Sequence, residues 1–122
     1  GATCGGRAYA AVAPLSRDQA LTSAARQHSR DMAAGNYFSH EDRQGQPFGQ
    51  RISDAGFGGS QPWGENIAAG QATADAVVTG WMTMPDHCAN IMSDSYASMG
   101  IGYAYGVDSK YRHYWTQDFG GR

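Results

Sequence analysis

Three side chains with acid–base and metal-ligating chemistry stand out in this sequence of 122 residues: His40, Glu65 and His87. His40 lies in a Ser-His-Glu-Asp stretch and His87 in a Pro-Asp-His-Cys stretch, and each falls at the expected boundary of a structural element. Glu65 follows a glycine-rich segment and sits between Gly64 and Asn66. Functional side chains concentrate at such boundaries, where a rigid scaffold holds a loop in place. We therefore take these three residues as the candidate functional set.

This set is suited to two kinds of chemistry. Two imidazoles and one carboxylate form a three-ligand set for zinc or another divalent metal, with a further position open to water or a ligand. Without a metal, the same groups could perform general acid–base chemistry, with Glu65 as the base. Spacing alone does not choose between them, because the sequence has no His-Glu-x-x-His, no Cys-x-x-Cys, no Gly-x-Ser-x-Gly and no phosphate-binding loop.

The composition excludes several other classes of function. With 41% hydrophobic and 16% charged residues, the chain is typical of one globular domain covering residues 1–122. The net charge is −2 and the basic residues are scattered, so a nucleic-acid partner is not expected. No apolar run approaches the roughly 18 residues of a membrane helix. The start at Gly1-Ala2 resembles a trimmed terminus from which a leader has been removed.

The two cysteines, Cys4 and Cys88, lie far apart in a chain with 17 glycines. This pattern favours one disulfide across a long loop, which is worth about 4–5 kcal/mol in the chain-entropy model. Such a bridge requires an oxidising compartment. Two free buried thiols, or one thiol with a role at a metal, are the alternatives.

The clearest helix is predicted over residues 17–34. Its apolar side chains recur at the i, i+3, i+4, i+7 spacing of an amphipathic helix, and His28 falls at the centre of that stripe. A histidine there is typical of a hydrogen-bonded core residue, so we assign His28 no functional role. Ser16 is expected to cap the start of this helix, with Gln19 completing a capping box. Gly35-Asn36 is expected to end it.

The remaining elements are helical up to about residue 92 and extended after it. Helices are predicted over 48–55, from Thr73 to Pro85 and over 85–92. Strands are predicted over 96–106 and 111–119. Residues 65–70 are expected to form either a strand or an extended turn, and residues 1–16 are expected to be irregular. Gly100, Gly102 and Ala104 share one face of the first predicted strand, so we expect a helix to pack closely against that face. Helices and strands segregated in this way predict an α+β layered domain rather than a parallel βαβ sheet.

Seven short stretches, in order along the chain, resemble the bacterial branch of the CAP superfamily of cysteine-rich secretory, antigen 5 and pathogenesis-related proteins. They are residues 24–33 (AARQHSRDMA), 37–40 (YFSH), 64–70 (GENIAAG), 81–82 (WM), 87–92 (HCANIM), 100–102 (GIG) and 114–120 (YWTQDFG). Together they extend over most of the chain.

The resemblance implies a three-layer α-β-α sandwich with a small antiparallel sheet. It also implies a central cleft lined by two histidines, here His40 and His87, and two acidic residues, of which Glu65 is the first. At the position of the second acid this chain has Met84, whose thioether is a poor ligand for hard cations. The family has a helix upstream of the Cys4 region, so the resemblance implies a domain that lacks this first helix, and it supports a pair between Cys4 and Cys88.

The resemblance leads to three hypotheses of function. The first is a secreted, extracellular or periplasmic binding module, whose cleft takes a divalent metal such as zinc or a small or lipid-like ligand and whose partner is unknown. The second is a metal-assisted hydrolase of the peptidase type, with Glu65 as base and His40 and His87 as metal ligands. The third is a structural domain with a vestigial cleft. Met84 and the lack of a nucleophile motif favour binding over catalysis.

Overall fold

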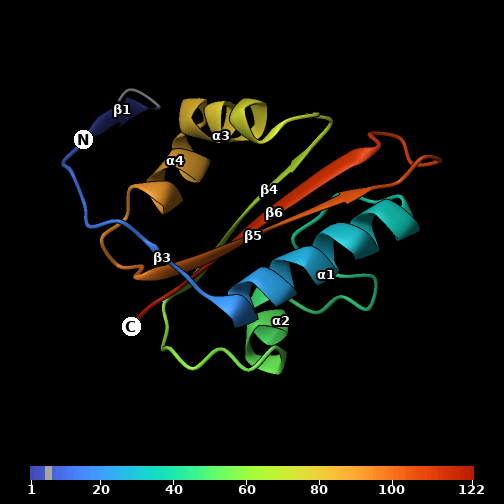
Figure 1. Ribbon diagram of the computed structural model, residues 1–122, viewed down its shortest axis with the longest axis horizontal. Coiled ribbons are helices and arrows are strands. Elements are labelled where there is room, and N and C mark those ends of the chain that lie inside the picture. Colours follow the sequence, from blue (N-terminus) through green and yellow to red (C-terminus); the bar gives the residue numbers. More distant parts are fainter. Residues whose placement is uncertain (5–6) are drawn as a thin grey trace.

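A four-stranded sheet forms the middle layer of the computed structural model, which describes residues 1–4 and 7–122 (Figure 1). Its strands are β3 (Ser16–Arg17), β5 (Ser98–Tyr105), β6 (His113–Gly120) and β4 (Trp63–Ala69), in that spatial order. β6 pairs antiparallel with both β5 and β4. The predicted antiparallel sheet is therefore confirmed for the three long strands. β3 differs and pairs parallel with β5, because it leads directly into a helix that runs along β5 in the same direction.

That helix, α1 (Gln19–Gly35), is the longest element and covers one face of the sheet (Figure 1). Asp18 caps its start, since the Asp18 side chain accepts a hydrogen bond from the Leu21 N–H at 2.9 Å. The predicted cap, Ser16, was wrong because Ser16 is already paired with β5. Asn36 ends the helix in the left-handed conformation, with φ 52°, as the sequence indicated.

His28 is fully buried in α1 and its Nε2 donates to the carbonyl of Ser39 at 2.7 Å, so its structural role is confirmed.

One face of β5 carries only the small residues Gly100, Gly102 and Ala104, which allows α1 to approach the sheet closely. A Cβ atom added at Gly100 would collide with the backbone of Thr22, and one added at Gly102 would collide with the backbone of Arg26. Because glycine presents no side chain, helix and strand backbones pack directly against each other. The close packing that the sequence predicted is confirmed.

The opposite face of the sheet is covered by α3 (Ala74–Thr83) and α4 (Pro85–Ile91), while α2 (Phe48–Asp54) packs beside α1 (Figure 1). Thr73 caps α3 as predicted, accepting a hydrogen bond from the Ala76 N–H at 3.2 Å. Under α3, one core cluster of buried residues consists of Ala68, Val77, Trp81 and Trp115. The α-β-α sandwich expected from the sequence is therefore the observed architecture, and β4 shows that residues 63–69 form a strand.

The N-terminal segment forms a hairpin rather than the predicted irregular chain. β1 (Ala2–Cys4) pairs antiparallel with β2 (Arg7–Tyr9), and residues 5–6 lie outside the described part of the chain. Cys4 forms a disulfide with Cys88 of α4, with their Cα atoms 6.3 Å apart, so the predicted bridge is confirmed. It fastens the hairpin to the helical layer that carries His87. None of the described helices is long and apolar enough to cross a membrane.

Substituting Gly102 with alanine tests the close approach of α1. We expect Gly102→Ala to lower the free energy of unfolding by about 1–3 kcal/mol, because the added methyl group overpacks a backbone contact that cannot yield. Gly58→Ala is the matched control, since a Cβ atom at Gly58 meets nothing within 4 Å. Denaturant unfolding of both variants measures the difference. Equal stability of the two would contradict the proposed packing.

Candidate functional site

The three residues singled out from the sequence line one pocket of about 350 Å³ beside β4. β4 is an edge strand, so helices from both layers reach its outer side. His40 comes from the loop after α1, Glu65 from the middle of β4 and His87 from the first turn of α4. We call this pocket the cleft, and its lining residues are His40, Phe48, Trp63, Gly64, Glu65, Asp86, His87, Asn90 and Tyr96.

Glu65 is the buried centre of the cleft, and both of its carboxylate oxygens are engaged. Arg51 of α2 donates from Nη1 to Oε2 at 2.7 Å and from Nη2 to Oε1 at 3.2 Å. His40 Nδ1 lies 2.9 Å from the same Oε1. Arg51 also donates from Nη2 to the carbonyl oxygen of His40. One arginine therefore fixes both the carboxylate and the loop that carries the first histidine.

Asp118 of β6 lies directly opposite Glu65 in the register of the sheet, and it is also fully buried. Burial raises the pKa of Asp118 well above its usual range, and the adjacent Glu65 carboxylate raises it further. Burial alone would also raise the pKa of Glu65, but the hydrogen bonds from His40 and Arg51 and the charge of Arg51 outweigh it and hold that pKa at about 2. Asp118 Oδ2 lies 3.9 Å from Arg51 Nη1, and the raised pKa of Asp118 favours its protonated form, so the negative charge of the pair rests mainly on Glu65.

His40 is oriented by Glu65. Because Nδ1 faces the buried carboxylate, Nε2 is the ring nitrogen left to meet a ligand, and the side chain is 49% exposed. A carboxylate behind an imidazole fixes both its orientation and its tautomer, and this arrangement is common behind metal-ligating histidines.

His87 is positioned by an amide network that ties α4 to β4. Asn66 Nδ2 donates to the carbonyl oxygen of His87 at 3.1 Å, and Asn90 Nδ2 donates to Asn66 Oδ1 at 2.9 Å. Asn90 also reaches the carbonyl oxygen of Glu65 at 3.3 Å. Burial lowers the pKa of His87, and the nearby His40 lowers it further, which favours a neutral imidazole with a free lone pair.

The arrangement of charges bears directly on a metal site. Among residues 1–4 and 7–122, no three His, Cys, Asp or Glu side chains are gathered so that they could hold a metal ion. Both oxygens of Glu65 are engaged by Arg51 and His40, so this carboxylate is not free to act as a metal ligand. His40 and His87 line the same pocket.

Met84, at the position of the second family acid, does not line the cleft. It is 53% exposed and lines a neighbouring apolar groove of about 470 Å³. Phe38 and Tyr111 stand on the same groove, which meets the cleft at His87. The chain therefore has an apolar surface where the family pattern would place a carboxylate.

Aromatic rings form the walls of the cleft. Trp63 lines it, as the sequence indicated, together with Phe48 and Tyr96. Trp81 and Trp115 are buried in the core, which confirms their structural role.

Sequence reasoning missed Arg51, Asp118, Asn66 and Asn90 as site residues. Asn66 lies next to Glu65 in the stretch 64–70, and Asn90 lies near His87 in the stretch 87–92. Closeness in sequence to a predicted site residue was therefore the signal that could have identified them. Asp118 could have been found from strand alternation, which places an acid among buried positions of β6. Nothing local in the sequence marks Arg51 as buried.

A model of the CAP family, described as the cysteine-rich secretory protein family, matches residues 4–119. The chain is 40% identical over 111 residues to the uncharacterized protein YkwD of Bacillus subtilis (strain 168), covering 89% of this chain and 40% of YkwD. A solved extracellular protein containing an SCP domain, from Bacillus anthracis (strain Ames), is 31% identical with a TM-score of 0.78, covering 91% of this chain and 35% of that chain.

An outer surface protein from Borrelia burgdorferi has a TM-score of 0.79 at 20% identity, covering 91% of this chain and 80% of that chain, which shows likeness of fold alone. The chain spans less than half the length of YkwD and of the Bacillus anthracis protein.

Two isosteric substitutions test the charges in the cleft. At neutral pH, Glu65→Gln should cost about 3–5 kcal/mol of unfolding free energy, because it leaves the buried Arg51 without a counter-charge. Asp118→Asn should instead raise the unfolding free energy, because the amide removes the cost, growing above pH 3.8, of a buried carboxyl group whose pKa is raised. Denaturant unfolding of the two variants against the parent measures both effects. Equal losses of unfolding free energy in the two variants would show that Glu65 and Asp118 share the negative charge.

The same assignment predicts a pH dependence. The pKa of Glu65 is lowered from 4.5 to about 2, so its stabilising contribution is complete above about pH 4.5 and is lost as the pH falls toward 2. Asp118 has a raised pKa and so makes the opposite contribution, a cost that develops as the pH rises above 3.8. In Glu65→Gln the acid-side loss should therefore be smaller than in the parent, and Asp118→Asn should flatten the profile above pH 3.8.

Proposed function

The chain belongs to the CAP family, and from that premise we propose that it is an extracellular binding domain whose cleft holds a ligand between His40 and His87. The single observation that carries the proposal is the engagement of Glu65 by Arg51 and His40. A carboxylate held in this way orients the imidazole in front of it and leaves the two histidines as the groups that meet a ligand. The disulfide between Cys4 and Cys88 supports a site of action in an oxidising compartment.

A divalent metal such as zinc is the ligand that this chemistry favours first. Neutral imidazoles suit zinc, copper and nickel. His40 Nε2 and His87 would be the protein ligands, and Glu65 would support His40 from behind rather than bind the metal. A zinc ion bound there would keep open coordination positions for an oxygen or nitrogen atom of a further ligand. The apolar groove that starts at His87 would then receive the apolar part of that ligand, whether small or lipid-like.

The hydrolase alternative depends on Glu65 as a general base, and the electrostatics of the cleft argue against it. An effective base has a pKa near the working pH, whereas the pKa of Glu65 is held at about 2. Both of its oxygens also accept hydrogen bonds already, from Arg51 and His40.

Calorimetric titration with zinc chloride tests the binding proposal. We expect saturable heat with the parent protein and at least a tenfold loss of affinity in the His40→Ala/His87→Ala double variant. His113→Ala is the matched control, because His113 stacks on Tyr103 at the far end of the β5–β6 hairpin. No heat from the parent, or equal heat from the double variant, would remove zinc as the ligand.

A panel of peptide and ester substrates separates binding from hydrolysis. The parent protein is expected to give no turnover above buffer. Turnover that is lost in Glu65→Gln and retained in Asp118→Asn would instead support the hydrolase.

A further inference from the structure

The two edges of the sheet differ in whether their outward backbone groups have hydrogen-bond partners. On the outer edge of β4, side chains from the helical layer and the following loop cap the backbone carbonyls. The donors are Asn90 to the carbonyl of Glu65 (3.3 Å), Trp81 to that of Ile67 (3.1 Å) and Tyr96 to that of Trp63 (3.4 Å). This edge is therefore closed to a further strand.

The outer edge of β5 is open along most of its length. β3 pairs only with Ser98 and Met99, and the Asp18 N–H donates to the carbonyl of Met99 at 2.9 Å. At the other end of the strand, the Gly106 N–H donates inward to Arg112 of the hairpin. Backbone groups alternate in direction along a strand. The N–H and C=O groups of Ile101, Tyr103 and Tyr105 must therefore point outward, where no described strand pairs with them.

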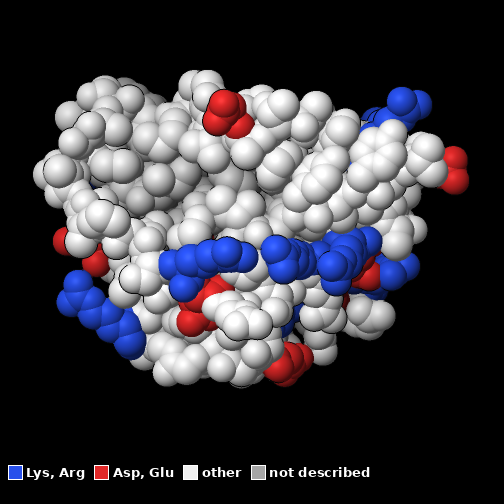
Figure 2. Space-filling model, in the orientation of Figure 1, with Lys and Arg blue, Asp and Glu red and all other residues white. Residues whose placement is uncertain are grey.

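One flank of this open edge is basic. α1 runs alongside β5, with Thr22 against Gly100 and Arg26 against Gly102. Arg30, one helical turn beyond Arg26, lines a separate groove with Asp31, Asp42 and Asp54. Arg17, at the end of β3, and Arg26 line the same polar groove of about 430 Å³. Among the described residues, no carboxylate forms an ion pair with Arg17, Arg26 or Arg30. Figure 2 shows basic side chains in a band across the middle of this face.

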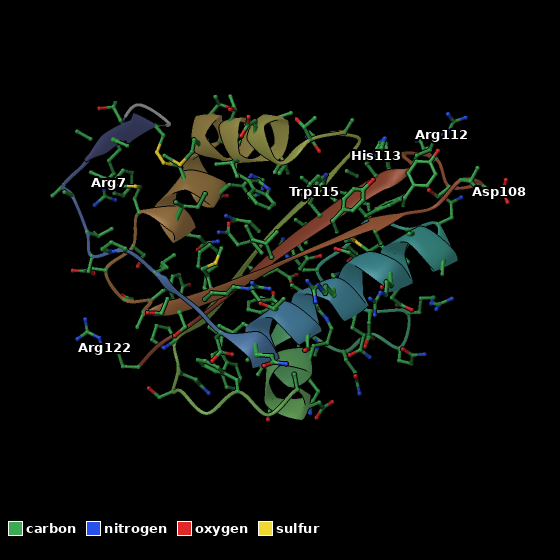
Figure 3. All side chains as sticks on the ribbon, viewed as in Figure 1. Arg7, Asp108, Arg112, His113, Trp115 and Arg122 are labelled. Atoms are coloured by element: carbon green, nitrogen blue, oxygen red, sulfur yellow. A yellow bond between two sulfur atoms is a disulfide. The ribbon has the colours of Figure 1, made fainter. Side chains whose placement is uncertain are left out.

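The other flank is aromatic and uncharged. Tyr103 and Tyr105 are 40% and 53% exposed. The Tyr103 hydroxyl lies 2.7 Å from His113 Nδ1, so the ring is held on the sheet surface. Figure 3 shows His113 and Trp115 on this end of β6, with Asp108 and Arg112 beyond them at the hairpin tip.

We propose that the open edge of β5 is a docking site for an extended acidic peptide, which adds to the sheet beside β5 as a further strand in line with β3. An added strand gains affinity from backbone hydrogen bonds and specificity from alternate side chains. Here one set of side chains would face Arg17 and Arg26, which selects carboxylates, and the other set would face Tyr103 and Tyr105, which selects apolar or aromatic groups. The site is separate from the cleft and independent of the proposed function.

A second copy of this chain fits the same edge less well. Two copies paired antiparallel through β5 would be related by a two-fold axis, which places both α1 helices on the same face of the joined sheet. Arg26 of each copy would then lie near Arg26 of the other copy. Like charges placed together oppose association. The arginines therefore discourage self-pairing at an open edge and favour a partner of opposite charge.

The probe is a fluorescent peptide of nine residues that alternates glutamate with valine, and its anisotropy is followed as the protein is added. Saturable binding is expected for the parent protein, with at least a tenfold loss of affinity in Arg17→Glu/Arg26→Glu. The same variant should gain affinity, by a similar factor, for the peptide in which lysine replaces glutamate. The matched control is Arg7→Glu/Arg122→Glu, which makes the same change in net charge at residues that do not line the groove of Arg17 and Arg26 (Figure 3).

A second peptide isolates the backbone contribution. N-methylation of alternate amides removes the hydrogen bonds of one strand edge and keeps every charge, so it should abolish binding in one of the two methylation registers. Binding that survives both registers would show an electrostatic surface without strand addition and would overturn the proposal. A dimer of the parent protein in sedimentation velocity that Tyr103→Pro dissolves would also overturn it, in favour of a second copy.

Discussion

The ion pair between Arg51 and Glu65 is the interaction on which the geometry of the cleft depends. Two charges are removed from water there, which is unfavourable unless each is fully engaged by hydrogen bonds. Arg51 meets that requirement by spanning Glu65 of β4 and the His40 carbonyl of the loop after α1. The raised pKa of Asp118 follows from the same constraint, because a second ionised acid would exceed the single buried cation. The position of His40 is thus set by its contacts with the buried Glu65 carboxylate and with Arg51.

The second constraint is the face of β5 that carries Gly100 and Gly102. It acts toward the other edge of the sheet, away from the cleft beside β4. Because α1 rests directly on the strand backbone, Arg26 comes close to the strand edge instead of standing above a layer of side chains. The same packing aligns α1 with β5 over several turns. Helix, edge and arginines therefore form one surface, whereas the other edge is occupied by donors from α3, α4 and Tyr96.

Periodicity was enough to predict most helices and strands, whereas the three layers and the shared cleft of His40, Glu65 and His87 were predicted from the resemblance to the CAP superfamily. The cap of α1 was predicted too early in the chain, because Ser16 and Asp18 are both good caps and only the pairing of β3 decides between them. The charge state of the site could not be predicted. It depends on Arg51, which is 14 residues from Glu65 along the chain, and on an acid that only the strand register brings opposite.

The disulfide links the geometry of the cleft to the redox environment in which the chain folds. Cys88 follows His87 in α4, and its partner lies 84 residues away in the N-terminal hairpin. A chain that has not met an oxidising environment has no covalent tie between that hairpin and the helix that presents His87. Formation of the bond would therefore complete the attachment of the helix that carries His87, which links the finished geometry of this helix to an oxidising environment.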